Sequence, residues 1–140
     1  MNKKSSISLF LAATSALALT ATGNTAVGGC ALFANTNGGG NTTVGYQSQM
    51  ATTTGDHNSS IGNGSLRANT TGSSNTASGV YALHCNTTGG CNTASGHYAL
   101  RANTTGSYST AVGGKALTAN TTGNNQAFST FALQKTTTGT

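Results

Sequence analysis

The chain has 140 residues, of which only 5% are charged, and it contains a single acidic residue and no proline or tryptophan. Ordinary globular domains carry roughly 25% charged residues. One carboxylate, Asp56, excludes paired-carboxylate catalysis within a chain, and the scattered cations exclude the clustered basic footprint of nucleic-acid binding. The remaining alternatives are a disordered low-complexity chain and a strict repeat fold, which periodicity distinguishes.

The N-terminus is typical of a secretory signal peptide, which we predict for residues 1–21. Lys3 and Lys4 form a short positive region, and the apolar stretch ISLFLAATSALAL follows from Ile7 to Leu19. Small residues then stand at the spacing that signal peptidase recognises, with cleavage near Ala21. The alternative is an uncleaved anchor, but the apolar run is shorter than the roughly 20 residues of a spanning helix. We therefore expect a secreted chain with no membrane span after cleavage.

Residues 22–140 are predicted to form one repeat domain with a period of 17 residues. Units begin at Asn24, Asn41, Asn58, Asn75, Asn92 and Ser109, and a seventh begins one residue early at Asn125. Counting positions from this residue, the consensus is NTAVGxxALxANTTGxx. A period near 20 residues indicates a solenoid and is too short for a helical repeat. Because Thr and Val recur, we predict an all-β parallel β-solenoid of about seven coils, with NTAV as strand and ALxA as a second extended segment.

Glycine recurs at positions 5 and 15 of the unit. This predicts two corners per coil, where the backbone needs positive φ or close approach to a neighbour. The position-5 glycines are Gly28, Gly45, Gly62, Gly79, Gly96 and Gly113. The position-15 glycines are Gly38, Gly55, Gly72, Gly89, Gly106 and Gly123, and Gly139 follows in the last unit.

The predicted core is thin. Position 9 carries Leu32, Leu66, Leu83, Leu100, Leu117 and Leu133, and position 4 carries Val27, Val44, Ile61, Val112 and Phe128. Gln49 interrupts the leucines, where we expect Met50 to substitute, and Ser78 and Ser95 interrupt position 4. A buried large side chain contributes roughly 1.5–3 kcal/mol, while ordering each residue costs about 1–2 kcal/mol. We therefore expect cooperative folding, association between chains, and the weakest core in the two units with serine.

Asparagine recurs at position 12. The residues are Asn35, Asn69, Asn86, Asn103 and Asn120, with Thr52 and Thr136 at the equivalent places. In a parallel stack, equivalent side chains lie about 4.8 Å apart, so that their amides can hydrogen-bond to one another. The scarcity of charge agrees with this, because like charges at that spacing repel. We predict a structural asparagine ladder.

The sequence offers few groups for catalysis or metal binding. Asp56 and His57 are neighbours at a repeat corner, which favours a loop, and His84 and His97 occupy variable positions. The glycines lack the strand–loop–helix context of a phosphate-binding loop. We therefore expect no enzymatic activity and no cofactor.

Three cysteines remain. Cys85 and Cys91 flank the corner Asn86–Gly90 and are candidates for a disulfide in a secreted chain. Cys30 would then be left for intermolecular pairing or for burial as a small apolar side chain. Metal binding is less favoured, because there is no CxxC pair or histidine at ligand spacing.

The stretch TAVGGKALTANTTG, from Thr110 to Gly123, resembles the 17-residue NTAxGxxALxxNTTGxx repeats of bacterial and phage surface fibres. The stretches TAVG at Thr25 and SSIG at Ser59 are similar, more loosely, to the head repeats of YadA-like trimeric autotransporter adhesins. The resemblance covers the chain from Asn24 to Thr140. It implies a left-handed parallel β-roll, usually trimeric, in a secreted fibre or adhesin.

Three functions compete on these observations. The favoured one is a secreted or cell-surface structural or adhesive repeat protein, a homo-oligomeric trimer or filament that meets a host-cell or glycan surface and no nucleic acid. The alternative is an ice-binding β-solenoid with two files at positions 12 and 14. Those files are Asn69/Thr71, Asn86/Thr88, Asn103/Thr105, Asn120/Thr122 and Thr52/Thr54. An enzyme is least favoured, because it would need residues from several chains.

Overall fold

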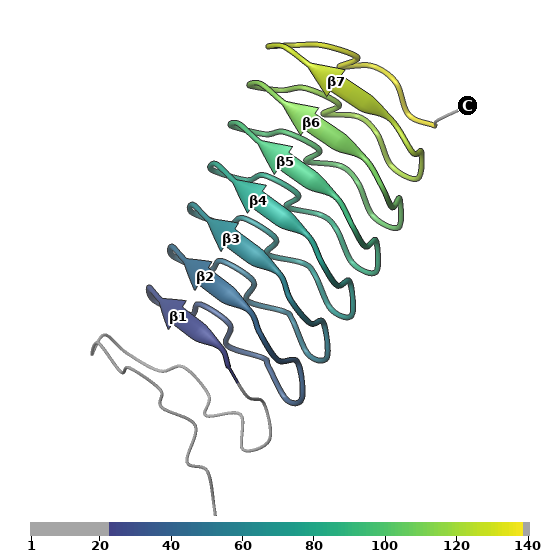
Figure 1. Cartoon of the computed structure of the whole chain (residues 1–140). Coiled ribbons are helices and arrows are strands. Elements are labelled where there is room, and N and C mark those ends of the chain that lie inside the picture. Colours follow the sequence, from purple (N-terminus) through teal and green to yellow (C-terminus); the bar gives the residue numbers. More distant parts are fainter. Residues whose placement is uncertain (1–22, 139–140) are drawn as a thin grey trace, which may run out of the picture.

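A computed structural model describes residues 23–138, which form a parallel β-solenoid and confirm the predicted all-β fold class (Figure 1). Seven strands lie in one sheet in sequence order, so that each coil pairs only with its neighbours. The described residues contain no helix long and apolar enough to cross a membrane. The predicted signal peptide, residues 1–21, lies outside the described residues.

Each strand is three residues long and occupies positions 2 to 4 of its unit. The strands are β1 (Thr25–Val27), β2 (Thr42–Val44), β3 (Ser59–Ile61), β4 (Thr76–Ser78), β5 (Thr93–Ser95), β6 (Thr110–Val112) and β7 (Gln126–Phe128). We number the coils 1 to 7 after their strands. Parallel pairing matches equivalent positions, for example Ala77 with Ala94. The register holds at the last step, where Ala111 pairs with Ala127 although this repeat is one residue shorter.

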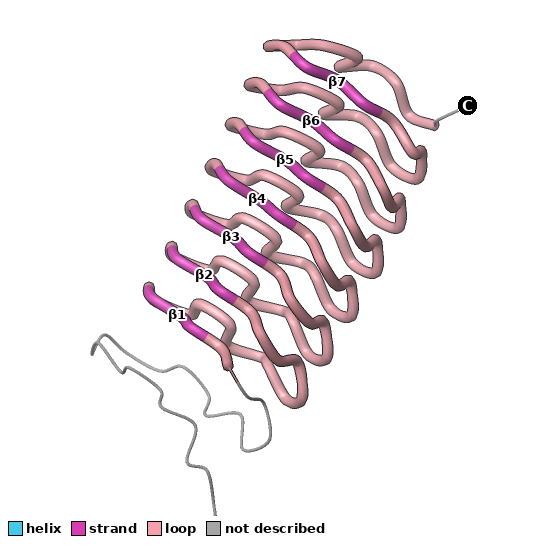
Figure 2. The backbone as a smooth tube through the Cα atoms, viewed as in Figure 1, coloured by secondary structure: helices cyan, strands magenta, loops and turns pink. Residues whose placement is uncertain are grey.

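The ALxA segment is a turn region and not the second extended segment that we predicted (Figure 2). Its leucines have left-handed backbone conformations, such as Leu83 at φ 50° and Leu100 at φ 51°, which no extended strand contains. The turns nevertheless hydrogen-bond from coil to coil. The N–H of Leu83 donates to the carbonyl of Ala99 at 3.0 Å. Backbone hydrogen bonds therefore join successive coils outside the sheet as well.

The two glycine columns meet different requirements. At position 5, Gly79 has φ 138°, a conformation that residues with a Cβ rarely adopt. At position 15, Gly72 lies outside that region, but a Cβ there would clash with the carbonyl oxygen of Gly89 in the next coil. Position 15 therefore needs glycine for close stacking, whereas position 5 needs it both for its conformation and for stacking, since a Cβ at Gly79 would lie 2.6 Å from the carbonyl oxygen of Gly96.

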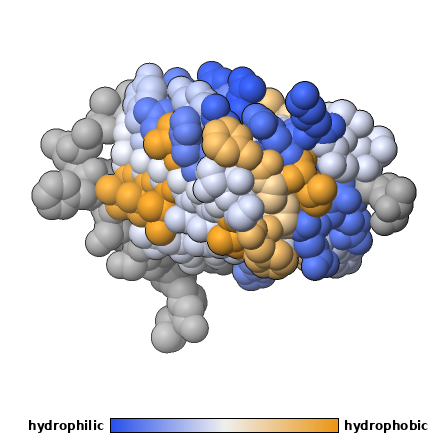
Figure 3. Space-filling view, turned by 90° about the horizontal axis from the view of Figure 1, so that it is seen from above, coloured by the Kyte–Doolittle hydropathy of each residue, from blue (hydrophilic) through white to orange (hydrophobic). Residues whose placement is uncertain are grey.

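The core lies on the opposite strand face from the one that we predicted. Position 4 is exposed in every coil, with Val27 at 45% and Ile61 at 53%. Position 3 points inward instead, and Ala77 and Ala94 are buried. Successive strand residues face opposite sides, and the leucines of position 9 leave room for only a small residue opposite them. On the face shown in Figure 3, apolar side chains gather in patches among hydrophilic ones.

Because position 3 and not position 4 points inward, the interior of the middle coils differs from the predicted one. Ser78 and Ser95 lie on the outer face of the sheet and not in the core. Coils 4 to 6 instead contain a continuous apolar interior, the apolar cluster: Ala77, Ala82, Leu83, Ala94, Ala99, Leu100, Ala111, Ala116 and Leu117. The prediction that the two units with serine have the weakest core is therefore wrong.

Coils 2 and 3 fill much of the same interior with polar side chains, although Leu66 of coil 3 is also buried. Gln49 itself occupies the leucine position and is fully buried, while Met50 is only half-buried, so the predicted substitution by Met50 is wrong. We call Thr43, Ser48, Gln49, Ser60 and Ser65 the polar cluster. The Nε2 of Gln49 donates to the Oγ of Ser60 at 2.9 Å, and the Oγ atoms of Ser48 and Ser60 lie 2.7 Å apart.

Candidate functional site

The position-12 asparagines form a buried ladder. The Nδ2 of Asn86 donates to the Oδ1 of Asn69 at 2.9 Å, and Asn103 donates to Asn86 at 2.8 Å. Asn86 also donates to the carbonyl of Gly89 at 2.9 Å, which ties the ladder to the glycine corner. Asn35 is buried, and its amide atoms have no hydrogen-bond partner.

A second asparagine ladder at position 1 was missed by the sequence analysis. The Nδ2 of Asn75 donates to the Oδ1 of Asn58 at 3.1 Å, and Asn92 donates to Asn75 at 3.1 Å. The same Oδ1 of Asn58 accepts the backbone N–H of Asn75 at 3.0 Å. The signal was present, because each of the first five units begins with asparagine. Both ladders are structural, since their amides bond within the solenoid.

Burial of position 12 removes the exposed array that we predicted for ice binding. Asn69, Asn86 and Asn103 are fully buried, whereas the neighbouring Thr71 and Thr88 are exposed. Positions 12 and 14 therefore do not present two files to solvent. The prediction of an Asn/Thr face is wrong, because the amides turn inward to satisfy the backbone at the corner.

The cysteines do not form the bridge that we considered. Cys30, Cys85 and Cys91 are all free thiols. The N–H of Cys85 donates to Arg101 in the next coil, whereas the N–H of Cys91 donates to Ser73 in the preceding coil. Each cysteine of the candidate pair is thus fixed to a different neighbouring coil. Pairing of Cys30 between chains stays a prediction.

The three histidines and Asp56 do not gather into one cluster. Asp56 and His57 remain neighbours at a corner, with His57 exposed. His97 is exposed and lies against Tyr98, with ring centroids 3.9 Å apart. Within residues 23–138, no three histidine, cysteine, aspartate or glutamate side chains gather into a metal-binding group. The absence of enzymatic activity stays a prediction.

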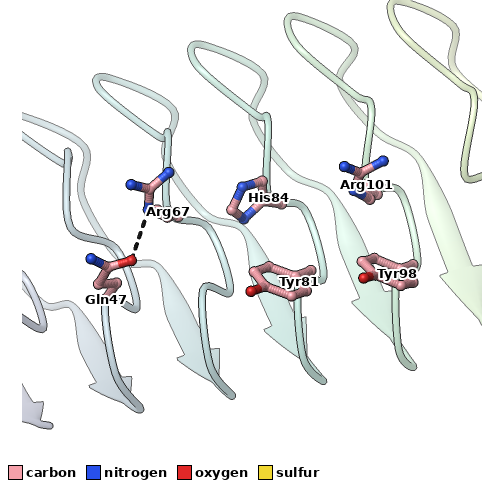
Figure 4. A pocket seen from close by; sticks show the side chains of 6 residues that line it. All are labelled: Gln47, Arg67, Tyr81, His84, Tyr98 and Arg101. Atoms are coloured by element: carbon pink, nitrogen blue, oxygen red, sulfur yellow. Dashed lines mark hydrogen bonds between the residues drawn. The ribbon is translucent and has the colours of Figure 1, made fainter.

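A groove runs along the edge formed by positions 7 and 10 of coils 2 to 5 (Figure 4). It has a volume of about 330 Å³ and is lined by Gln47, Arg67, Tyr81, His84, Tyr98 and Arg101. Gln47, Tyr81 and Tyr98 form the lower row in Figure 4, and the other three form the upper row. The repeat thus converts two variable positions into two parallel rows of side chains.

The aromatic row is held in place by ring contacts. The rings of Tyr81 and Tyr98 are parallel within 7°, with centroids 5.5 Å apart. Tyr81 also packs over Gly64 at the preceding position 7, where a Cβ would lie 2.7 Å from a ring atom of Tyr81. His84 meets the ring of Tyr81 edge-on at 4.9 Å, and its Nδ1 donates to the carbonyl of Gly64 at 2.9 Å. These contacts make the groove wall a pre-arranged surface.

The cationic row has no counter-charge. Asp56, the only acidic side chain of the protein, lies at another corner, where its Oδ1 accepts the N–H of Gly39 at 2.7 Å. The guanidinium of Arg101 lies 5.2 Å from the centre of the Tyr98 ring. No side-chain carboxylate of the described residues therefore neutralises Arg67 or Arg101. The groove is suited to an anionic ligand with an apolar face.

Sequence reasoning identified His84 as a residue at a variable position but did not place it in a groove with Arg67 and Arg101. The sequence does not show that positions 7 and 10 line the same edge of the solenoid. They do so only because the turn between them folds back. Comparisons with protein-family models, with curated proteins and with solved structures find no match for this chain.

Proposed function

We propose that this chain is a secreted or cell-surface structural repeat protein that presents an adhesive surface and associates with copies of itself. The observation that carries the proposal is the exposed outer face of the sheet. It is uncharged in every described coil and carries an apolar file at both ends of the solenoid. The residues of this file are Val27, Val44, Ile61, Val112 and Phe128.

Exposed apolar surface of this kind favours association. Burying it contributes roughly 25 cal/mol per Å² of apolar area, and contiguous exposed patches on soluble proteins commonly mark interaction sites. The parallel strands hold Val44 and Ile61 in register on neighbouring coils. Packing three such faces around a common axis would bury the file, which supports the trimeric arrangement implied by the repeat resemblance.

Light scattering after size-exclusion chromatography tests the association. The mature chain is expected to form a trimer or larger assembly, and the variant Val44→Glu with Ile61→Glu is expected to dissociate to monomers. Thr88→Glu, an exposed position away from the sheet, is the matched control. A wild-type chain that stays monomeric and binds neither cells nor glycans would overturn the proposal.

Secretion is tested separately by expressing residues 1–140 in a bacterial host. The expected result is a chain in the extracytoplasmic fraction whose N-terminus, read by mass spectrometry, follows cleavage near Ala21. Retention in the cytoplasm with Met1 still present would contradict the predicted signal peptide.

Ice binding remains a second candidate on a different surface from the one first expected. The outer sheet face holds two files in register, Thr76 and Thr93 at position 2 beside Ser78 and Ser95 at position 4. Their spacing is that of parallel strands, about 4.8 Å. Inhibition of ice recrystallisation by a monomeric chain, abolished by Thr93→Glu, would favour this function, whereas burial of the same face in a trimer would exclude it.

A further inference from the structure

We propose that the groove formed by positions 7 and 10 binds an extended acidic polysaccharide lying along the solenoid axis (Figure 4). The inference rests on the proposed surface function and names the ligand class that the surface would recognise. It is carried by three properties of the groove: unneutralised guanidinium groups, their spacing, and the ordered aromatic row beside them.

Charge selects an anion. Arg67 is half-buried, and its Nε donates to the Oε1 of Gln47 at 3.1 Å, which orients the guanidinium along the groove. Arg101 is exposed and is packed over Tyr98. Guanidinium groups form paired hydrogen bonds with carboxylates and comparable oxyanions. With no carboxylate of the described residues beside them, these two side chains are available for anionic groups of a ligand.

The distance between the two arginines favours a polymer that carries an acid group on every second sugar. Arg67 and Arg101 occupy the same position two coils apart, which corresponds to about 10 Å at the spacing of parallel strands. An extended polysaccharide with one acid group per disaccharide presents its charges at a comparable interval. Single-stranded nucleic acid carries a phosphate at every nucleotide and normally requires a more densely basic track. The groove therefore favours the polysaccharide.

The tyrosines provide the surface for the sugar rings. Tyr81 and Tyr98 are half-buried, and their parallel contact limits their motion before any ligand arrives. Such pre-arrangement lowers the entropy lost on binding. The C–H groups of pyranose rings pack on aromatic side chains, and the phenol oxygens can hydrogen-bond to sugar hydroxyls.

The track continues beyond the groove. Lys115 follows Tyr98 at position 7 of the next coil, and its Nζ lies 5.3 Å from the centre of the Phe131 ring. It adds a third cation in the direction of the C-terminal coils. A ligand that spans coils 3 to 6 would meet Arg67, Arg101 and Lys115 in turn.

The test measures binding of fluorescent oligomers of ten units to the full mature chain by anisotropy, at low and at physiological salt. The probes are hyaluronan, with one carboxylate per disaccharide, heparin, a neutral cello-oligosaccharide and a ten-nucleotide oligo(dT). Hyaluronan or heparin should bind, more weakly at high salt, and the neutral sugar should not. Arg67→Gln with Arg101→Gln should weaken binding about tenfold or more.

Two further variants keep the result interpretable. Gln already occupies position 10 as Gln134 and position 7 as Gln47, so that R67Q, R101Q and Tyr98→Gln introduce residues that the repeat accommodates. Tyr98→Gln should also weaken binding, and Lys135→Gln, a cation at position 11, should change affinity less than twofold. Circular dichroism and the melting temperature verify that each variant is folded.

Failure of this inference is distinct from failure of the proposed function. A wild-type chain that self-associates and is secreted, but binds neither acidic polysaccharide, overturns the ligand assignment alone. Unchanged affinity in the double arginine variant overturns the site. Tighter binding of oligo(dT) than of both polysaccharides, lost in the same variant, identifies the groove as a nucleic-acid site and also overturns the inference.

Discussion

Coils 2 and 3 fill much of the solenoid interior with hydroxyl and amide groups, whereas coils 4 to 6 fill the equivalent positions with alanine and leucine. The backbone register is the same in both regions. The polar cluster pairs most of its groups internally, but the Oε1 of Gln49 has no partner. The difference shows that the backbone ladder defines the coil, while the interior tolerates either chemistry when most of its polar atoms are paired.

Placing a polar side chain in the interior of the apolar coils should have the largest effect on stability. Leu83→Gln places an amide among alanines and leucines that offer no side-chain hydrogen bonds. We expect the free energy of unfolding to fall by at least about 3 kcal/mol, from lost apolar packing and from an unpaired buried amide. Urea denaturation followed by circular dichroism measures it. Leu83→Met is the conservative control, and a loss under about 1 kcal/mol for the glutamine variant would contradict the comparison.

Removing the hydroxyl group at the centre of the polar cluster should lower the free energy of unfolding by less than Leu83→Gln does. The Oγ of Ser60 contacts Gln49, Ser48 and Thr43 at 2.9, 2.7 and 2.8 Å. Ser60→Ala leaves the buried Nε2 of Gln49 with only long contacts to backbone carbonyls, and we expect a loss of about 1–3 kcal/mol. The exposed Ser95→Ala is the matched control in the same denaturation assay, and equal effects would show that the cluster contributes nothing.

Replacing both partners of a hydrogen bond in the polar cluster by apolar residues should restore the stability that Ser60→Ala alone removes. In Gln49→Leu combined with Ser60→Ala, donor and acceptor disappear together, while Thr43 and Ser48 keep their own hydrogen bond at 2.6 Å. We expect a free energy of unfolding within about 1 kcal/mol of the wild type, and above that of Ser60→Ala alone. A double variant less stable than the single one would show that coils 2 and 3 require their polar groups.

The smallest effect is expected on the outer face of the apolar coils. Ser95→Val adds a large residue where position 4 is exposed, so we expect the stability of the dilute, dissociated chain to change by no more than about 0.5 kcal/mol. If position 4 were part of the core, valine would instead stabilise the chain by more than 1 kcal/mol. Denaturation at several concentrations separates this effect from association.

Most of the fold could be predicted from the repeat period of the sequence. The units predicted seven in-register strands because the repeat places N-T-A-V once per coil, and the strands lie there. The leucines were correctly assigned to the core for all but Leu133, which is 49% exposed. The strand face was assigned incorrectly, since valine is the larger apolar residue and alanine carries too little signal to reveal that it points inward.

The groove could not be predicted in the same way. Its members are separated by up to 54 residues, from Gln47 to Arg101. Their proximity depends on the left-handed turn residues between positions 7 and 10, such as Tyr98 at φ 61° and Leu100 at φ 51°. Nothing in the pattern of a tyrosine or a leucine indicates that conformation, which non-glycine residues adopt only when the surrounding structure stabilises it.

The sequence alone determined the period, the parallel register and the identity of the corner residues, because stacking equivalent residues at one spacing follows directly from repetition. Only the tertiary structure decided which face is inside, which asparagines are buried and which variable residues meet in the groove. The physical reason is that these properties depend on the path of the turns within a coil. That path is fixed jointly by the hydrogen bonds of Leu83 and Asn86 to neighbouring coils and by the volume available opposite each leucine.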